Sequence, residues 1–236
     1  MAYENISQIE GHISSIVNQD SSVPSEGSPD DSLWKAFINR AQTEYAESND
    51  WEILKKVNYQ TVSIGTGYSM ASIGLPADYR KLAGPVTNYG TGIAGGTAWA
   101  EILPERQLEY SDVDKIFWVQ GDPTNGFSLQ WNVVNWTSPG GSGATIQINY
   151  YSVPTALTSQ SQYPVIQDTE FLSQRTIAYV FESRSDPRYQ AEEAKAREKL
   201  LQLIENSNLA KYSSYVSPQP VRSGQESRQK FRFGKS

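Results

Sequence analysis

The hydrophobic period of the chain changes twice along its 236 residues, and this change limits the folds that it can adopt. Apolar side chains recur every three or four positions over most of the first 50 residues, which predicts amphipathic helices. From Trp51 to about Val153 they alternate, as in a half-buried antiparallel sheet, and after Pro154 the helical spacing returns. The sequence therefore predicts an α+β fold: a helical bundle from the N- and C-terminal helices, an inserted antiparallel β-rich domain and an extended C-terminal arm.

These changes of period divide the chain into four predicted segments. They are the N-terminal helices (1–50), the β-rich insert (51–154), the C-terminal helical pair (155–208) and the arm (209–236). Within the first segment, "SSVPSEGSP" separates two helices because Ser, Pro and Gly interrupt helical structure.

Both N-terminal helices are predicted to bury one side. The first has an apolar stripe made of Tyr3, Ile6, Ile9, Ile13, Ile16 and Val17. The second is expected to begin at a cap formed by Asp30 or Asp31. Its predicted buried side consists of Leu33, Trp34, Phe37, Ile38, Ala41 and Tyr45.

The C-terminal pair contains one fully buried helix and one amphipathic helix. The chain is apolar almost all round from Ile177 to Phe181, so this helix should be surrounded by neighbours. The last helix is predicted to start with Asp186 as cap and Pro187 in its first position. Glu193 and Arg197 are spaced as an exposed ion pair. The predicted inward side chains are Tyr189, Ala196, Leu200, Leu203 and Ile204.

The β-rich segment has several clear strand signals. In "FSLQWNV" the side chains of Phe127, Leu129, Trp131 and Val133 share one face, and "TIQINYY" alternates in the same way. The stretch "IFWVQGDPTNGFSLQW" predicts a hairpin with its turn at Asp122–Gly126. "KVNYQTVSI" and "TAWAEIL" are further expected strands, and "PERQLEYSD" is an expected short helix.

The composition gives little support for catalysis, cofactors or metals. The chain has no cysteine and one histidine, His12, so a thiolate nucleophile or a multi-histidine zinc site is excluded. "GTGIAG" has the spacing of a dinucleotide fingerprint, but a strand is expected after it where that motif needs a helix. The acids that a glycosidase would need are scattered candidates: Glu101, Glu105, Asp112 and Asp114. We therefore expect a protein that is not an enzyme and that holds no cofactor.

Four tryptophans leave a carbohydrate-binding module open as an alternative. Trp99, Trp118, Trp131 and Trp136 all lie in the β-rich segment, where exposed rings could stack on sugars. Trp131 shares the buried parity of its strand, which favours a place in the core for that ring.

The C-terminal arm differs in charge from the rest of the chain. Of 20 basic and 26 acidic residues, six basic residues and one acid follow Asn208, so the preceding part carries 14 bases and 25 acids, a net charge of −11. The arm could bind nucleic acid, remain a solvated terminus, or order on a protein partner as an added strand. An acidic body argues against a broad nucleic-acid surface and favours a protein partner. The predicted contact residues are Arg228, Lys230, Phe231, Arg232 and Phe233.

Two stretches resemble tailed-bacteriophage head-to-tail adaptor proteins of the podovirus tail tubular protein A-like kind. One is the closing run "YYSVPTALTSQSQYPVIQDTEFLSQRTIAYVFESRSDPRYQAEEAKAREKLLQLIENSN"; the other is "YAESNDWEILKKVNYQTVSI" followed by "SIGLPADYRKL". The resemblance covers roughly residues 33–208. It departs from the family in the N-terminal helix and the "SSVPSEGSP" linker, which could be a second arm or an extra bundle helix.

The resemblance implies a structural virion protein in the neck, made in the cytoplasm of the bacterial host. Such adaptors form a ring, typically of twelve copies, between the portal protein and a downstream tail or nozzle protein. Implied partners are the portal, other copies of the chain, the tail component, and genomic DNA that passes through the lumen without sequence-specific binding. No membrane contact is expected, since no run of 18 apolar residues occurs. A tail tube or receptor-binding component is the alternative within virions.

Overall fold

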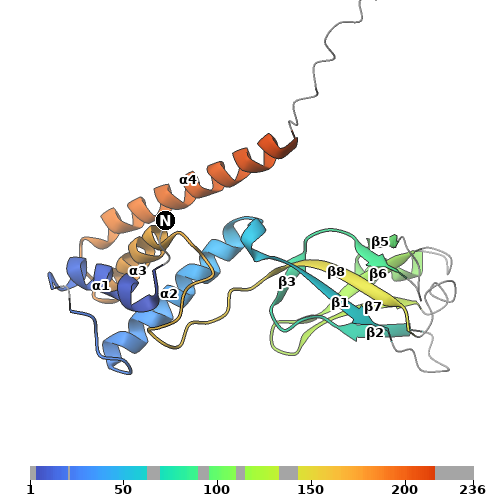
Figure 1. Ribbon diagram of the computed structural model, residues 1–236, viewed down its shortest axis with the longest axis horizontal. Helices are drawn as coiled ribbons and strands as arrows, with labels where there is room; N and C mark the ends of the chain where they lie inside the picture. The colour runs from blue at the N-terminus through green and yellow to red at the C-terminus, as the bar shows by residue number, and fades with distance from the viewer. Residues whose placement is uncertain are drawn as a thin grey trace, which may run out of the picture.

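The computed structural model describes residues 4–20, 22–62, 70–89, 96–109, 115–132 and 143–215. Within these ranges the chain forms four α-helices and eight strands in a curled mixed sheet, so the predicted α+β class is confirmed. Figure 1 shows α1, α2 and α3 at one end of the molecule, the sheet at the other, and α4 lying across the helices. The helices are α1 (Ile6–Val17), α2 (Pro29–Ser48), α3 (Thr169–Ser183) and α4 (Tyr189–Tyr215), with 3-10 turns η1 (Glu52–Leu54) and η2 (Pro104–Glu109). The strands are β1 (Lys55–Thr61), β2 (Met70–Gly74), β3 (Tyr79–Leu82), β4 (Val86–Asn88), β5 (Thr97–Glu101), β6 (Ile116–Asp122), β7 (Gly126–Asn132) and β8 (Thr145–Ser152).

Local capping explains where α1 and α2 begin. Asn5 and Gln8 form a capping box at α1, in which each side chain accepts the other residue's backbone N–H. The prediction that Asp30 or Asp31 caps α2 is wrong, because the Ser28 hydroxyl accepts the N–H of Asp31 at 3.2 Å. Pro29 then occupies the first turn, where its missing N–H costs nothing.

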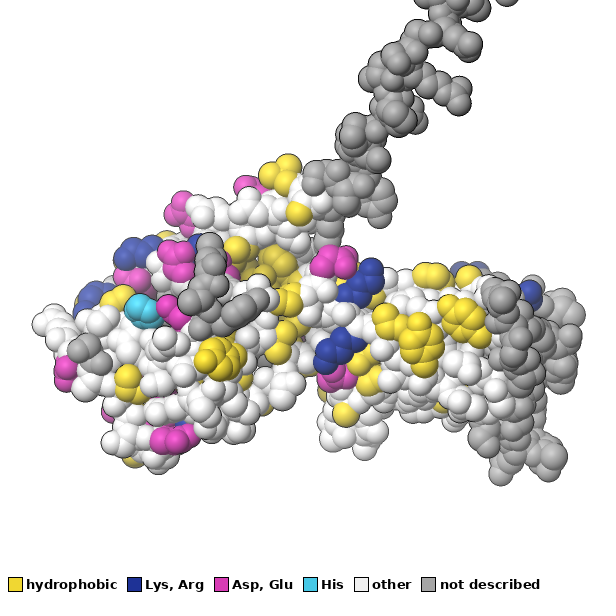
Figure 2. All heavy atoms as spheres, viewed as in Figure 1, with side chains coloured by type: hydrophobic (Ala, Val, Ile, Leu, Met, Phe, Trp, Pro, Cys, Tyr) yellow, Lys and Arg dark blue, Asp and Glu magenta, His cyan; other side chains and the backbone are white. Residues whose placement is uncertain are grey.

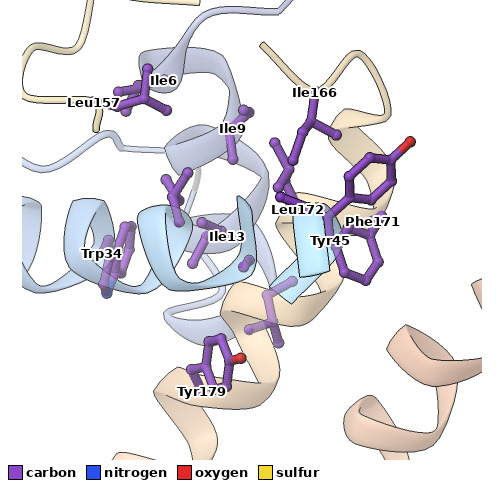
Figure 3. Close-up of a cluster of buried hydrophobic side chains, with 14 of the residues drawn as sticks. Ile6, Ile9, Ile13, Trp34, Tyr45, Leu157, Ile166, Phe171, Leu172 and Tyr179 are labelled. Carbon is purple, nitrogen blue, oxygen red and sulfur yellow. The ribbon is translucent and has the colours of Figure 1, made fainter. Parts of the chain in front are cut away.

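The first three helices share one hydrophobic core. Figure 3 shows Ile9 and Ile13 of α1, Trp34 and Tyr45 of α2, and Phe171 of α3 directed into the same cluster. The prediction for α3 is confirmed, since residues 177–181 are all buried. Two predicted core residues differ: Ile16 and Leu33 are exposed at the rims of their helical stripes.

Helix α4 is longer than its sequence pattern predicts. It starts at Tyr189, after a turn in which the Asp186 carboxylate accepts the N–H of Arg188 at 2.9 Å. It continues to Tyr215, seven residues past the predicted end of the helical pair. Ala196 is buried, and four of the predicted inward residues pack against the helical core while partly exposed: Tyr189, Leu200, Leu203 and Ile204.

The strands are arranged in the order β1-β8-β4-β5-β6-β7-β2, with β3 also paired to β8. The prediction of a purely antiparallel sheet is wrong at one place, because β5 and β6 pair in parallel. The link between them, residues 102–115, includes η2 and is long enough to return the chain to the same end of the sheet. The two outermost strands approach each other, since the Gln60 amide donates to the Gly74 carbonyl at 2.9 Å.

A second hydrophobic core lies inside the curled sheet. Leu129 and Trp131 of β7 are fully buried there with Ile146 and Ile148 of β8, as their alternation predicts. Trp51 joins the end of α2 to the sheet-forming segment, because its ring stacks on Tyr45 with centroids 4.0 Å apart and belongs to the helical core. The molecule thus has one core among the helices and another within the sheet.

The predicted β6–β7 hairpin is confirmed, and it depends on a close approach of its two strands. Gly121 has φ +134°, and a Cβ atom there would lie 2.2 Å from the Gly126 carbonyl oxygen. We expect Gly121→Ala to lower the free energy of unfolding by about 2 kcal/mol, because both the backbone conformation and the contact become unfavourable.

Gly126→Ala is the matched control. Gly126 also has positive φ, at +84°, but nothing lies within 4 Å of its Cβ position. The control should cost about 1 kcal/mol from backbone strain alone. Urea denaturation of both variants measures the difference, and equal losses would contradict the close-approach argument.

Candidate interaction surfaces

The predicted arm contacts lie beyond the part of the chain that the structure describes. Arg228, Lys230, Phe231, Arg232 and Phe233 all follow Tyr215, the last described residue. The structure therefore describes the base of the arm, which is α4, and leaves the contact prediction as a prediction.

Buried charge fixes the first turns of α4 to the other helices. The Arg175 guanidinium of α3 binds the Glu44 carboxylate of α2, with 2.6 Å between Nε and Oε2, and also the Glu193 carboxylate of α4. The Tyr179 hydroxyl donates to the same Glu44 oxygen at 2.6 Å. Burial raises the pKa of Tyr179 to about 12, so this hydroxyl remains a donor at neutral pH. These contacts connect three helices through one cation.

The later part of α4 has apolar side chains in solvent. Leu201 and Leu209 are 61% and 66% exposed. Figure 1 shows the C-terminal half of α4 extending past α1, α2 and α3, and Figure 2 shows hydrophobic side chains on its surface. Leu201 and Leu209 therefore form a candidate contact surface at the base of the arm.

The outward side of three adjacent strands forms a second surface, which we call the outer sheet face. We define it by Val57, Tyr59 and Thr61 of β1, Thr145, Gln147 and Asn149 of β8, and Thr87 of β4. These residues lie directly opposite one another in the strand register, while their neighbours in sequence face the sheet core. Val57 and Tyr59 are 51% and 62% exposed. Figure 2 shows hydrophobic side chains on the surface where Figure 1 places β1 and β8.

The described tryptophans of the β-rich segment do not form a platform for sugars. Trp99, Trp118 and Trp131 are 5%, 3% and 0% exposed, so three of the four rings in that alternative pack inside the protein. Trp136 lies outside the described residues. The carbohydrate-binding alternative loses the surface on which it depends.

A polar cluster is buried between α1, α2 and the segment before α3. Glu10 of α1 is fully buried, and the Gln160 amide donates to its carboxyl at 2.8 Å and to Asp31 at 2.9 Å. Lys35 binds the Asp31 carboxylate at 2.9 Å. Burial first, and the nearby Asp31 charge second, raise the pKa of Glu10 to about 7. The cluster joins α1 and α2 to the segment before α3 through buried polar contacts.

Among the described candidates for catalysis, no contact joins His12, Glu101 and Glu105. The His12 side chain is 60% exposed, with its Nε2 atom 3.4 Å from the Glu4 carboxylate. Glu101 and Glu105 are exposed, and Asp112 and Asp114 lie outside the described residues. All of "GTGIAG", residues 90–95, also lies outside them, but strand β5 follows, where the fingerprint needs a helix. In the described ranges we find no cluster of potential metal ligands and no helix able to span a membrane.

The candidate sites of this α+β protein are exposed surfaces on α4 and on the sheet. Such surfaces are typical of a structural protein that binds other macromolecules. The sequence profile of the SU10 adaptor proteins matches residues 5–222, which include all four helices and all eight strands of the structure. The chain belongs to the SU10 adaptor protein family, and is therefore a structural phage adaptor protein. This confirms the resemblance to phage head-to-tail adaptors. No curated protein matches the chain.

Proposed function

We propose that the protein is a head-to-tail adaptor in the virion neck, where copies form a ring between the portal and the tail. The observation that carries this proposal is the family match, because it spans both the helices and the sheet. A dodecamer is the copy number that the resemblance implies. The downstream face of the ring would receive the tail or nozzle protein.

The organisation of the chain agrees with this function. We take the helices as one bundle and residues 51–154 as a domain inserted into it, a division supported by the two separate hydrophobic cores. Residues after Tyr215 would form the extended arm, which continues from the C-terminus of α4. Because the arm is basic and the rest of the chain is acidic, the arm can contact a partner from which the rest of the chain remains separate.

The ring would also extend the DNA channel. Residues before Leu209 carry a net charge of −11, and a wall of that sign repels phosphates, so DNA passes without specific binding. A basic lumen in the assembled ring would overturn this part of the proposal.

Portal binding is the direct test. Full-length protein mixed with cognate portal rings should co-migrate in size-exclusion chromatography with light scattering, in several copies per ring. Truncation after Tyr215 removes Arg228, Lys230, Phe231, Arg232 and Phe233 and should weaken binding by at least about tenfold, because the loss is repeated in every copy.

Two further variants separate the contact residues from the general charge of the arm. Arg228→Ala/Lys230→Ala/Arg232→Ala should weaken binding as the truncation does. The control Arg222→Ala/Lys235→Ala removes basic residues outside the predicted contact and should have little effect. If the truncated protein binds as well as the full chain, the helices make the contact and the arm assignment is wrong. If the full chain does not bind, the alternative of a tail tube or receptor-binding component gains weight.

A further inference from the structure

We propose that the outer sheet face is the contact through which one copy of this chain meets the next. The inference rests on the proposed ring, and it names one of the two surfaces that meet in each head-to-tail contact of such a ring. It comes from the chemistry of seven side chains whose positions are fixed by the strand register: Val57, Tyr59, Thr61, Thr87, Thr145, Gln147 and Asn149.

Charge is the first argument for a second copy as the partner. The body of each chain is strongly acidic, so two copies repel wherever their acidic surfaces meet. The outer sheet face carries no charged side chain over these seven positions; beyond one end of it lie Lys55 of β1 and Lys81 of β3, which both pair with Tyr151 of β8. Those two lysines are paired with Glu52 and Asp50. The face is therefore a place where like-charged bodies can approach without a large electrostatic cost.

Composition is the second argument. Cores of protein interfaces are depleted in charge and enriched in aromatic residues. The side chains of Val57 and Tyr59, two positions apart on β1, are exposed to solvent. The inward-facing side chains of β8 are buried instead, as at Ile146 and Ile148. An uncharged face also lacks the lysines and arginines that binding to phosphates requires, so DNA does not fit it.

Two polar members of the face, Gln147 and Asn149, are already hydrogen-bonded to each other. The Gln147 side-chain amide N–H donates to the Asn149 Oδ1 atom at 3.1 Å, and the Gln147 Oε1 atom accepts from the Tyr89 hydroxyl. Because Gln147 and Asn149 keep these partners when water is removed, covering them costs less than covering two unpaired amides.

The size of the face explains why copies would assemble on a template. Residues 57–61 of β1 span about 17 Å, and three strands span about 14 Å, which gives roughly 240 Å². Stable interfaces bury about 800 Å² per partner, so this face alone should give weak association in solution. On a portal ring, neighbouring copies are held at high effective concentration, and a weak contact becomes sufficient.

Tyr59→Asp tests the proposal, with Tyr163→Asp as its matched control. Both tyrosines are well exposed, at 62% and 57%, but Tyr163 lies in the segment before α3, away from the sheet. Thermal unfolding first checks that both variants fold. We expect Tyr59→Asp to raise the concentration needed to fill portal rings by about tenfold, because it places a charge in a contact between acidic bodies. Tyr163→Asp should fill rings as the wild type does. Mass photometry of the rings gives the number of bound copies.

A photo-crosslinking residue at position 59 or 163 gives a readout that does not need the portal. At high protein concentration, position 59 should yield crosslinked homodimers and position 163 should not. If the wild type binds the portal and Tyr59→Asp fills the rings equally well, this inference is wrong, whereas the adaptor function is supported. If the wild type fails to bind the portal, crosslinked homodimers from position 59 still support a contact between copies at this face. If position 59 gives no crosslinked homodimers, the inference is overturned.

Discussion

Arg175→Met should lower the free energy of unfolding by about 3 kcal/mol, because it leaves two carboxylates without their shared cation. Glu44 of α2 and Glu193 of α4 both bind this guanidinium, whose side chain is 12% exposed. The methionine keeps much of the apolar volume of the arginine stem, so the loss reports mainly on the charge. Because Glu44 is itself 32% exposed, we place the cost at the lower end for buried pairs.

Arg197→Met is the matched control for this variant. Arg197 binds the same Glu193 carboxylate at 2.7 Å, but its side chain is 73% exposed. A pair in that position should contribute less than about 1 kcal/mol. Urea denaturation of the two variants therefore separates the buried contact from the exposed one. Equal effects of the two substitutions would show that the Arg175 cluster adds nothing beyond ordinary surface pairing.

The Arg175 variant should also loosen α4 before the rest of the protein unfolds. Hydrogen exchange in α4 is expected to become faster relative to α2, since Arg175 of α3 links Glu193 of α4 to Glu44 of α2. Adding Glu44→Gln to Arg175→Met should recover part of the stability, because Glu44 is then no longer a carboxylate without a cation, whereas Glu193 keeps Arg197. In the proposed adaptor, a loosened α4 would misplace the base of the arm and weaken portal binding.

This cluster illustrates which contacts a sequence can predict. The Glu193–Arg197 pair follows from its i,i+4 spacing on one helix, and the structure confirms it. Arg175 and Glu44 are 131 positions apart, and nothing in either local sequence indicates that they meet. Local spacing specifies pairs within an element, whereas packing between elements decides the rest.

The sheet shows the same division between local and long-range information. The alternation in β7 and β8 predicts which side chains face the core, because that period is a property of a single strand. The parallel β5–β6 pair was not predictable, since it depends on how residues 102–115 return the chain. The predicted start of α2 differs from the observed one because Asp30 and Asp31 are both common capping residues. The extended backbone of Ser28, before Pro29, lets its hydroxyl accept the N–H of Asp31 instead.

The candidate interaction surfaces were only partly accessible from sequence. The charge of the arm indicates a partner, but its contact residues lie beyond the described chain. The outer sheet face was missed, because alternation alone would place Val57 and Tyr59 in the core. The register with β8 instead sets Asn58 opposite the buried Ile148, which turns Val57 and Tyr59 outward. A polar residue on the inner side of β1 is the signal that could have revealed it.

Glu10 should make the stability of the protein fall as pH rises from about 4.5 to about 7. Its carboxyl is fully buried, and its pKa is raised from 4.5 to about 7, by burial first and by the Asp31 charge second. In this window the folded protein holds a proton that the unfolded chain has lost, so raising the pH favours unfolding. The contribution lost amounts to about 3 kcal/mol, at about 1.4 kcal/mol per pH unit, and is constant above the folded pKa.

Glu10→Gln should remove this dependence, because the amide keeps the shape of the protonated carboxyl and cannot ionise. We expect the variant to be about 2 kcal/mol more stable than the wild type at pH 8 and within about 1 kcal/mol of it at pH 5. Glu47→Gln removes an exposed carboxylate from α2 and should leave the Glu10 contribution unchanged. Urea denaturation at several pH values measures the slopes. If Glu10→Gln keeps the wild-type slope, the Gln160 amide and the Lys35 ammonium stabilise an ionised Glu10 beside Asp31, and the buried cluster carries two negative charges at neutral pH.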